Sequence, residues 1–232
     1  MKDENLPVII VIIPAYNEEE AIQLVIKEIP SFVTEIIVVN NNSSDDTRGL
    51  ALRAGAAVVE ESRPGYGHAC LKGIDCAKNL NPQPNIIVFL DGDHSDYPAE
   101  MQLLVDKIIN EDCDLVIGSR ALGTIEKGSM TVPQLFGNWL ATRLLKIFYG
   151  IKYTDLGPFR AVKLTSLLRM NMQDTTYGWT VEMQLKAAKL KMKTAEVPVG
   201  YRKRIGFSKI SGTIKGTLLA GYKIITTIFK YL

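Results

Sequence analysis

Two carboxylates stand where a hydrophobic run of the sequence ends. The stretch NIIVFLDGDHSDYPAEM covers residues 85–101, and its apolar part leads into Asp91 and Asp93. Alternate residues of an extended segment point to the same side, so the two negatively charged carboxylates lie close together. They repel unless a cation lies between them, and Mg²⁺ or Mn²⁺ prefers oxygen ligands, with phosphate oxygens completing its shell. The pair predicts a metal that holds a phosphate-bearing substrate.

The other polar residues of the stretch have simpler interpretations. Asp96 precedes Pro98, a residue suited to a first helical turn, so we interpret Asp96 as the N-cap of that helix. His94 stands beside the pair, but hard divalent ions prefer oxygen, so we interpret it as a supporting or surface group. The plain alternative for the pair itself is a solvated acidic turn.

Other phosphate-handling classes fit the sequence less well. The P-loop pattern G-x-x-x-x-G-K-[ST] is absent, as is G-x-G-x-x-G after the first apolar run. A haloacid-dehalogenase-type phosphatase resembles DGDHS only superficially, because that family places its nucleophile after the first strand. The 27 basic and 25 acidic residues give a net charge of +2, which argues against a nucleic-acid partner.

Alternating apolar and amphipathic segments must position the pair. Continuous apolar runs predict strands buried on both faces at residues 8–14, 35–40, 56–60, 86–91 and 114–119. Helix-like segments cover residues 17–29 and begin near residues 45 and 98. The alternation predicts an α/β fold, a mainly parallel sheet with helices on both sides.

Polar residues follow every one of these runs. The segments are PAYNE, NNSSDD, SRPGYG, DGDHSD and GSR. Ligands bind at the carboxyl ends of strands in such sheets. We therefore expect one edge of the sheet to hold a ligand, with the carboxylate pair in its middle.

An ordered set of motifs resembles family 2 glycosyltransferases with the GT-A (Rossmann-like) fold. The motifs are VIIPAYNEEEAI, IIVVNNNSSDDT, GYGHACLKGI, VFLDGDHSDYP and VIGSR. TDLGPFRAV and EVPVGYRKRIGFSKISG narrow the likeness to the dolichol- or polyprenyl-phosphate mannose or glucose synthase-like branch. The resemblance implies one domain over residues 1–232: a nucleotide-sugar half (1–120), an acceptor half (121–210) and a C-terminal amphipathic helix (211–232).

The resemblance also implies an inverting, metal-dependent sugar transfer from a nucleotide-diphosphate donor to polyprenyl phosphate. Asp91 and Asp93 would hold Mg²⁺ or Mn²⁺, and the catalytic set would be Asp93, Asp155 and Arg120. The substrate-binding set would be Pro14, Ala15, Tyr16, Glu18, Asn41, Gly67, Asp91, Ser119, Arg204, Ser208 and Lys209. One departure is Asn40-Asn41-Asn42 in place of the usual Asp-Asp-Gly, which leaves the base of the nucleotide undetermined.

The acceptor decides what Asp155 does. Transfer to a hydroxyl needs a general base, for which Asp155 and Glu182 are the candidates. A lipid phosphate is already ionised near pH 7 and needs cations instead, such as Arg120 and Lys127. The alternatives to a polyprenyl-phosphate acceptor are a soluble or glycan hydroxyl with Asp155 as base, and a non-catalytic sugar-nucleotide-binding subunit.

Several residues near these motifs have two interpretations. Arg160 pairs with Asp155 or binds a phosphate, the pair being at least as well supported. Tyr177 and Trp179 stack on a sugar or acceptor, or else belong to the core. We interpret Arg202 and Lys203 as ordinary surface residues.

The sequence predicts a cytoplasmic protein, or one at the cytoplasmic face of a membrane. The N-terminus lacks the basic region of a signal peptide, and the three cysteines form no C-x-x-C pair. Lys215, Lys223 and Lys230 form a basic stripe in the C-terminal helix, and WLATRLLKIFYG is a second basic amphipathic segment. Both suit peripheral membrane contact, a dimer interface or docking on the core. The oligomeric state is left open.

Overall fold

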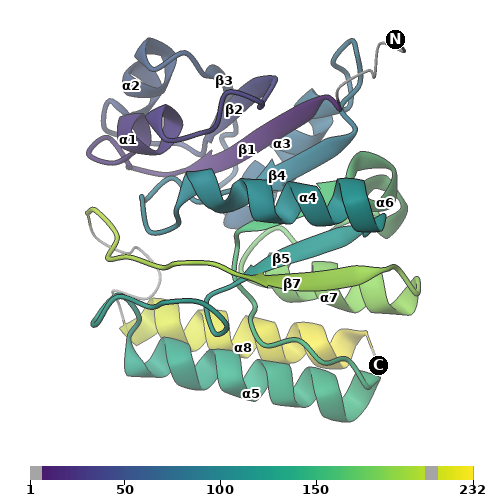
Figure 1. Ribbon diagram of the computed structural model, residues 1–232. Helices are drawn as coiled ribbons and strands as arrows, with labels where there is room; N and C mark the ends of the chain where they lie inside the picture. The colour runs from purple at the N-terminus through teal and green to yellow at the C-terminus, as the bar shows by residue number, and fades with distance from the viewer. Residues whose placement is uncertain (1–6, 207–213, 232) are drawn as a thin grey trace, which may run out of the picture.

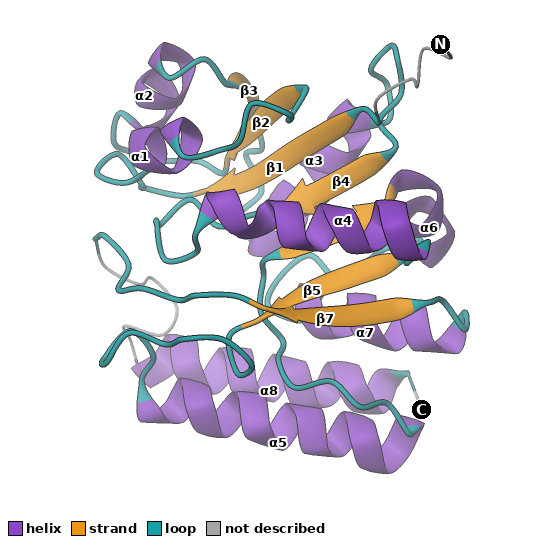
Figure 2. Ribbon diagram, viewed as in Figure 1, coloured by secondary structure: helices purple, strands orange, loops and turns teal. Residues whose placement is uncertain are grey.

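The computed structural model describes residues 7–206 and 214–231, which form one sheet between helices (Figures 1 and 2). The sheet has seven strands in the order β3-β2-β1-β4-β6-β5-β7. They are β1 (Ile9–Ala15), β2 (Glu35–Asn40), β3 (Ala57–Glu60), β4 (Ile86–Phe89), β5 (Leu115–Ser119), β6 (Arg160–Lys163) and β7 (Thr194–Pro198). Only β6 runs antiparallel to its neighbours β4 and β5. The prediction of a mainly parallel α/β sheet in one domain is confirmed.

Helices cover both faces of the sheet. They are α1 (Ile22–Lys27), α2 (Thr47–Arg53), α3 (Tyr66–Ala77), α4 (Met101–Glu111), α5 (Val132–Tyr149), α6 (Leu164–Met170), α7 (Trp179–Lys189) and α8 (Ile214–Lys230). One apolar core joins α3, α5, α6, α7 and α8 to the sheet, and a second joins α1, α2 and α4 to its other face.

The alternation of side chains along β1 explains its continuous apolar sequence. Ile10 and Ile12 enter the core beneath α3, whereas Val11 and Ile13 enter the core beneath α1 and α4. Because successive side chains of a strand point to opposite faces, a strand covered on both faces must be apolar throughout. The five predicted strands lie within two residues of β1 to β5, while the short strands β6 and β7 were not predicted.

The first helix is shorter than predicted. Residues 17–21 make turns instead of helix, and Asn17 adopts a left-handed conformation with φ 54°. The backbone N–H of Asn17 donates to Ser43 Oγ at 3.0 Å, and that of Glu18 donates to Thr47 Oγ1 at 2.8 Å. These bonds tie the loop after β1 to the loop after β2, and α1 begins only at Ile22.

The C-terminal helix lies against the protein core. Tyr149 on α5 donates its hydroxyl to the carbonyl of Ile228 on α8 at 2.6 Å, and the rings of Phe148 and Phe229 pack 5.4 Å apart. No described helix is both long enough and apolar enough to cross a bilayer. The side chain of Lys215 lies outside the described part of α8.

Candidate functional site

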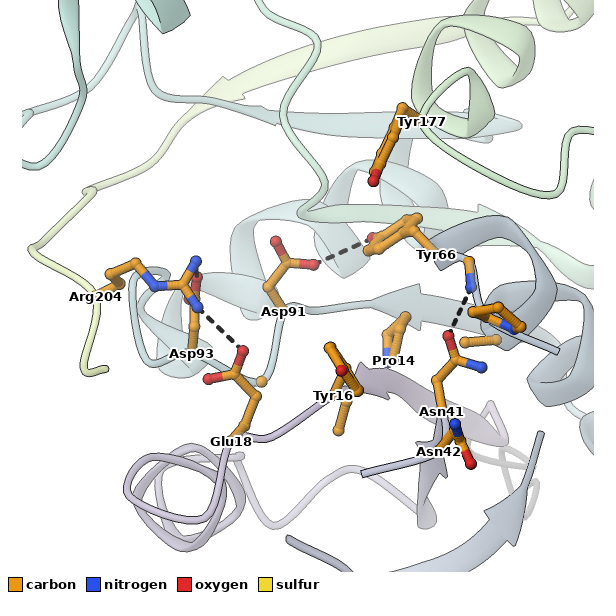
Figure 3. A pocket seen from close by; sticks show the side chains of 15 residues that line it. Pro14, Tyr16, Glu18, Asn41, Asn42, Tyr66, Asp91, Asp93, Tyr177 and Arg204 are labelled. Carbon is orange, nitrogen blue, oxygen red and sulfur yellow. Dashed lines mark hydrogen bonds and ion pairs between the residues drawn. The ribbon is translucent and has the colours of Figure 1, made fainter. Parts of the chain in front are cut away.

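One pocket opens where β1, β2 and β4 end, next to the start of α3 (Figure 3). Its volume is about 350 Å³. Eight of the residues predicted from the sequence line it: Pro14, Ala15, Tyr16, Glu18, Asn41, Asp91, Asp93 and Arg204. Tyr177, which the sequence offered as a stacking residue, also lines it, as do Gly65 and Tyr66, which belong to the predicted polar segment SRPGYG but were not singled out. The expected ligand edge of the sheet is therefore a pocket.

The carboxylate pair carries an electrostatic penalty. Burial, and then the charge of Asp93, raises the pKa of Asp91 to about 7, against 3.8 for a free aspartate. The Tyr66 hydroxyl donates to Asp91 at 3.2 Å, and the Ser95 backbone N–H donates to Asp93 at 2.9 Å. A bound cation would relieve the repulsion that these two neutral donors leave in place.

The residues present fit a divalent ion that shares its shell with a ligand. The described part of the chain holds no group of three or more His, Cys, Asp and Glu side chains that could enclose a metal. Two carboxylates with open surroundings suit Mg²⁺ or Mn²⁺, which keeps positions for phosphate oxygens and water. The donor set thus matches an ion held jointly by protein and phosphate.

Arg204 reaches the pocket from the segment after β7. Its guanidinium lies 3.1 Å from Asp93 and 3.0 Å from Glu18, bridging the ends of β4 and β1 (Figure 3). A cation placed there is available to an anionic ligand that enters the pocket. Ser208 and Lys209 lie outside the described residues.

Asn41 uses both its amide nitrogen and its amide oxygen in hydrogen bonds. This explains why an asparagine, and not an aspartate, stands at this position. Its nitrogen donates to the carbonyls of Glu61 and Arg63, at 2.9 and 2.7 Å, and its oxygen accepts the N–H of Gly65 at 2.9 Å. An aspartate is acceptor-only and would face two carbonyl oxygens. Asn41 therefore fixes the segment that leads from β3 into α3.

Gly67 is placed differently from its neighbours. It does not line the pocket, and a Cβ atom there would lie 2.1 Å from the carbonyl oxygen of Asp174. Its small size lets the segment before α7 pack on the start of α3.

A second charged cluster lies at the end of β5. Arg120 donates to Asp155 from its backbone N and Nε, each at 2.8 Å, and from Nη2 at 2.7 Å. Burial opposes the charge of Arg120, but its hydrogen bonds to Asp155 outweigh this and raise the Arg120 pKa. Ser119 is buried and lies 2.6 Å from Thr154 Oγ1. These residues do not line the pocket that holds Asp91.

The proposed pair of Arg160 and Asp155 is wrong. Arg160 is fully buried and donates to the carbonyls of Leu156, Gly157 and Thr180. It braces the backbone instead of binding a carboxylate. The partner of Asp155 is Arg120.

Asp96 also differs from the prediction. No side chain caps the short 3₁₀ turn at Pro98–Glu100, whose N-cap residue is Tyr97. Asp96 is 2% exposed, and neither of its carboxylate oxygens has a hydrogen-bond partner among the described residues. Burial, followed by the charges of Asp91 and Asp93, raises its pKa well above the usual value, while Arg120 opposes the shift. Asp96 is thus an unpartnered carboxyl group within the electrostatic reach of both clusters.

Two of the remaining candidates belong to a network beside the site. His94 Nε2 lies 2.8 Å from Glu28, and its side chain is only 13% exposed, which fits a supporting group better than a surface group. Arg202 is not an ordinary surface residue, because it bonds both Glu28 and the His94 carbonyl and stacks on Tyr97. Lys203 is exposed, as predicted.

Two others belong to the protein interior. Trp179 is a core residue that packs edge-on against Phe89. Glu182 is 1% exposed and accepts hydrogen bonds from the backbone N–H of Asp174 and the hydroxyl of Tyr231. A carboxylate occupied in this way is not available as a base.

Comparison with known proteins gives a consistent family. A model described as "Glycosyl transferase family 2" matches residues 10–169. An uncharacterized glycosyltransferase of Mycobacterium tuberculosis is 32% identical over 218 residues, 90% of this chain and 93% of that protein. A dolichyl-phosphate hexose transferase of Haloferax volcanii is 32% identical over 206 residues, 86% of this chain and 85% of that protein.

Solved structures share the fold. Glucosyl-3-phosphoglycerate synthase from Mycobacterium tuberculosis, crystallised with Mn²⁺, UDP and glucosyl-3-phosphoglycerate, superposes with a TM-score of 0.75. The match covers 97% of this chain and 80% of that chain at 22% identity. At this identity the likeness concerns the fold.

The repulsion at the carboxylate pair predicts that Asp91→Asn stabilises the metal-free protein above pH 7. A buried carboxyl with a raised pKa favours folding while protonated and opposes it once ionised, so the wild type loses stability as pH rises from about 4 through about 7. Asparagine can still accept the Tyr66 hydrogen bond. The difference in unfolding free energy should be near zero at pH 4 and reach a few kcal/mol at pH 8.

Urea denaturation in the presence of a chelator at several pH values measures this difference. An equal stability of Asp91→Asn and wild type at pH 8 would show that the pair carries no such penalty.

Proposed function

We propose that this chain, a glycosyltransferase that belongs to glycosyl transferase family 2, moves a sugar from a nucleotide-diphosphate sugar to polyprenyl phosphate. The transfer inverts the configuration at the sugar and depends on Mg²⁺ or Mn²⁺. The donor half spans residues 1–120 and the acceptor half residues 121–210. Tyr177 and Arg204 of the acceptor half also line the donor pocket.

The pocket supports the donor assignment. Pro14, Ala15 and Tyr16 would contact the nucleotide, with Asn41 fixing the floor of its site. Asp91 and Asp93 would hold the metal, which when bound neutralises charge on the diphosphate. Arg204 would turn from Asp93 to the phosphates, for which Ser208 and Lys209, outside the described residues, are further candidate ligands. The UDP and Mn²⁺ of the glucosyl-3-phosphoglycerate synthase crystals agree with this chemistry.

The observation that carries the acceptor assignment is the state of Asp155. Asp155 is 1% exposed and receives three hydrogen bonds from Arg120, so it orients a cation and is not free to take a proton. An ionised phosphate needs no base and is attracted to such a cation. Ser119, directly before Arg120, and the exposed Lys127 in the loop after it would assist Arg120. The name of the Haloferax volcanii relative, dolichyl-phosphate hexose transferase, agrees with this acceptor.

A hydroxyl acceptor is the second candidate. The observation that favours it is Asp96, a buried carboxyl group without a hydrogen-bond partner among the described residues. Its pKa is affected by the charges of Asp91 and Asp93 and by that of Arg120. In that case Asp96, and not Asp155, would be the base. The third candidate, a non-catalytic subunit, is disfavoured because Asp91, Asp93 and Arg204 are brought together in the pocket.

An exposed apolar surface supports an acceptor in a membrane. On α5, Val132, Phe136 and Trp139 are 78%, 59% and 55% exposed, and on α8 Leu218 is 68% exposed. Neither α5 nor α8 contains an acidic residue, and Arg143, Lys146 and Lys230 on these helices are exposed. An apolar surface with cations and without carboxylates matches an anionic lipid layer. Because α5 begins on the side where β5 and β7 end (Figure 1), this surface would hold the acceptor half near the cytoplasmic face of a membrane.

Transfer of label tests the proposal directly. GDP-mannose, UDP-glucose and UDP-N-acetylglucosamine, each radiolabelled, are incubated with polyprenyl phosphate and Mg²⁺ or Mn²⁺. We expect label from one donor to enter the organic phase and to be lost with chelator or with Asp91→Asn. Donor turnover without any lipid label would exclude the lipid-phosphate acceptor.

Replacement of Asp96 separates the two acceptor chemistries. With a phosphate acceptor, Asp96→Asn should change kcat less than about tenfold, whereas loss of a general base costs roughly 100- to 10,000-fold. Initial rates at saturating donor and acceptor measure the difference. A loss of the larger size, with donor affinity retained, would support the hydroxyl acceptor.

Trp139 is a natural reporter of membrane contact, because the other tryptophan, Trp179, is buried at 1% exposure. Addition of anionic phosphatidylglycerol vesicles should shift the fluorescence to shorter wavelength, and phosphatidylcholine vesicles should do so less. Trp139→Phe is the control, since it removes the reporter and keeps an apolar ring. An unchanged spectrum in both vesicle types would contradict membrane contact through α5.

A further inference from the structure

The segment between α6 and α7 brings Tyr177 to the donor pocket. Tyr177 lines the pocket, and its hydroxyl points toward the space beside Tyr66 and Asp91 (Figure 3). Residues 172–178 form neither helix nor strand, so side-chain contacts help to fix their conformation.

Two buried carboxylates organise this segment. Glu182 accepts the backbone N–H of Asp174 at 2.7 Å and that of Gln173 at 3.1 Å. The carboxylate of Asp174 in turn accepts the N–H groups of Thr176 and Gly178, at 2.8 and 3.1 Å. The position of Tyr177, which lies between these last two residues, therefore depends on Asp174.

Helix α8 and the residue that follows it contact both carboxylates. Lys223 Nζ lies 3.1 Å from Asp174 Oδ2, and the Tyr231 hydroxyl donates to Glu182 Oε1 at 2.6 Å. Gly178 also packs against α8, because a Cβ atom there would lie 2.5 Å from Thr227 Oγ1.

The other side of the segment supports the metal-binding end of the pocket. The Thr175 carbonyl accepts the backbone N–H of His68 at 3.1 Å, and a Cβ atom on Gly65 would lie 2.3 Å from the same carbonyl oxygen. Gly65 precedes Tyr66, whose hydroxyl bonds Asp91. A continuous series of contacts thus leads from α8 through residues 172–178 to the carboxylate pair.

We propose that Lys223 on α8 and Tyr231, the residue that follows this helix, are positioning residues of the donor site. They fix the segment that places Tyr177 in the pocket and supports Gly65 and Tyr66, so that nucleotide affinity depends on the docking of α8. This inference rests on the proposed donor function. It gives the C-terminal helix a role in donor binding on its inner side, separate from lipid contact on its outer side.

Binding of Mn²⁺ with UDP or GDP, followed by calorimetry, tests the proposal. Tyr231→Phe and Lys223→Met should each raise the Kd of the nucleotide that the wild type binds by roughly three- to tenfold. Glu182 keeps Lys186 at 2.8 Å and two amides, so Tyr231→Phe does not leave it unpaired. In turnover, KM for the donor should rise while kcat at saturating donor stays the same.

Matched variants separate positioning from general destabilisation. Tyr222→Phe removes a hydroxyl from the same helix at a side chain that is 69% exposed, and it should leave the Kd unchanged. Lys223→Arg should restore most of the affinity lost in Lys223→Met. Wild-type affinity in Tyr231→Phe and Lys223→Met, even with a lowered Tm, would overturn the inference. Failure of the wild type to bind either nucleotide would overturn the proposed donor function, and the inference with it.

Discussion

The repulsion between Asp91 and Asp93 is the constraint around which the pocket is arranged. Two carboxylates at the end of a buried strand cannot both ionise without nearby positive charge or strong donors. Three groups reduce this repulsion. Tyr66 on α3 donates a hydrogen bond to Asp91, and the backbone N–H of Ser95 donates one to Asp93. Arg204, from the segment after β7, forms an ion pair with Asp93. Ser95 is local to the pair, but Tyr66 and Arg204 come from distant parts of the chain, so these two groups reach the pair only once the fold has formed.

The pair of Arg120 and Asp155 places a positive charge in a largely buried position. Arg120 is nearly buried, and a lone guanidinium there would be costly to desolvate. Asp155 balances the charge of Arg120 and accepts hydrogen bonds from its Nε and Nη2, which fixes the orientation of the guanidinium group. A guanidinium has five N–H donors, so others remain for an incoming anion. A buried pair of this kind is weak evidence for stability, and orientation of a cation is the better explanation for its presence.

Sequence periodicity located the sheet and its ligand edge because both depend on local pattern. The apolar runs marked β1 to β5, and the polar segments after them supplied most of the pocket lining. What failed depends on tertiary contacts. Asp96 matches the local pattern of a helix cap, but it is buried and caps no helix. For Tyr177 the sequence left open a stacking role or a place in the core, and only the fold brings it to the pocket. Arg160 is only five residues from Asp155, but it lies within β6, opposite Phe89 and Ile117, and its guanidinium serves backbone carbonyls instead.

Asn41 shows how a departure from a motif can carry structural information. The position follows β2, where the related pattern has aspartate, and the amide here both donates to two carbonyls and accepts one N–H. The donated bonds hold residues 61–63, and the accepted bond holds Gly65, the residue on which the segment before α7 rests. An ionised aspartate could not make the donated bonds. In place of a charge at this end of the pocket, the amide provides a fixed path into α3, and α3 is the helix that brings Tyr66 to the carboxylate pair.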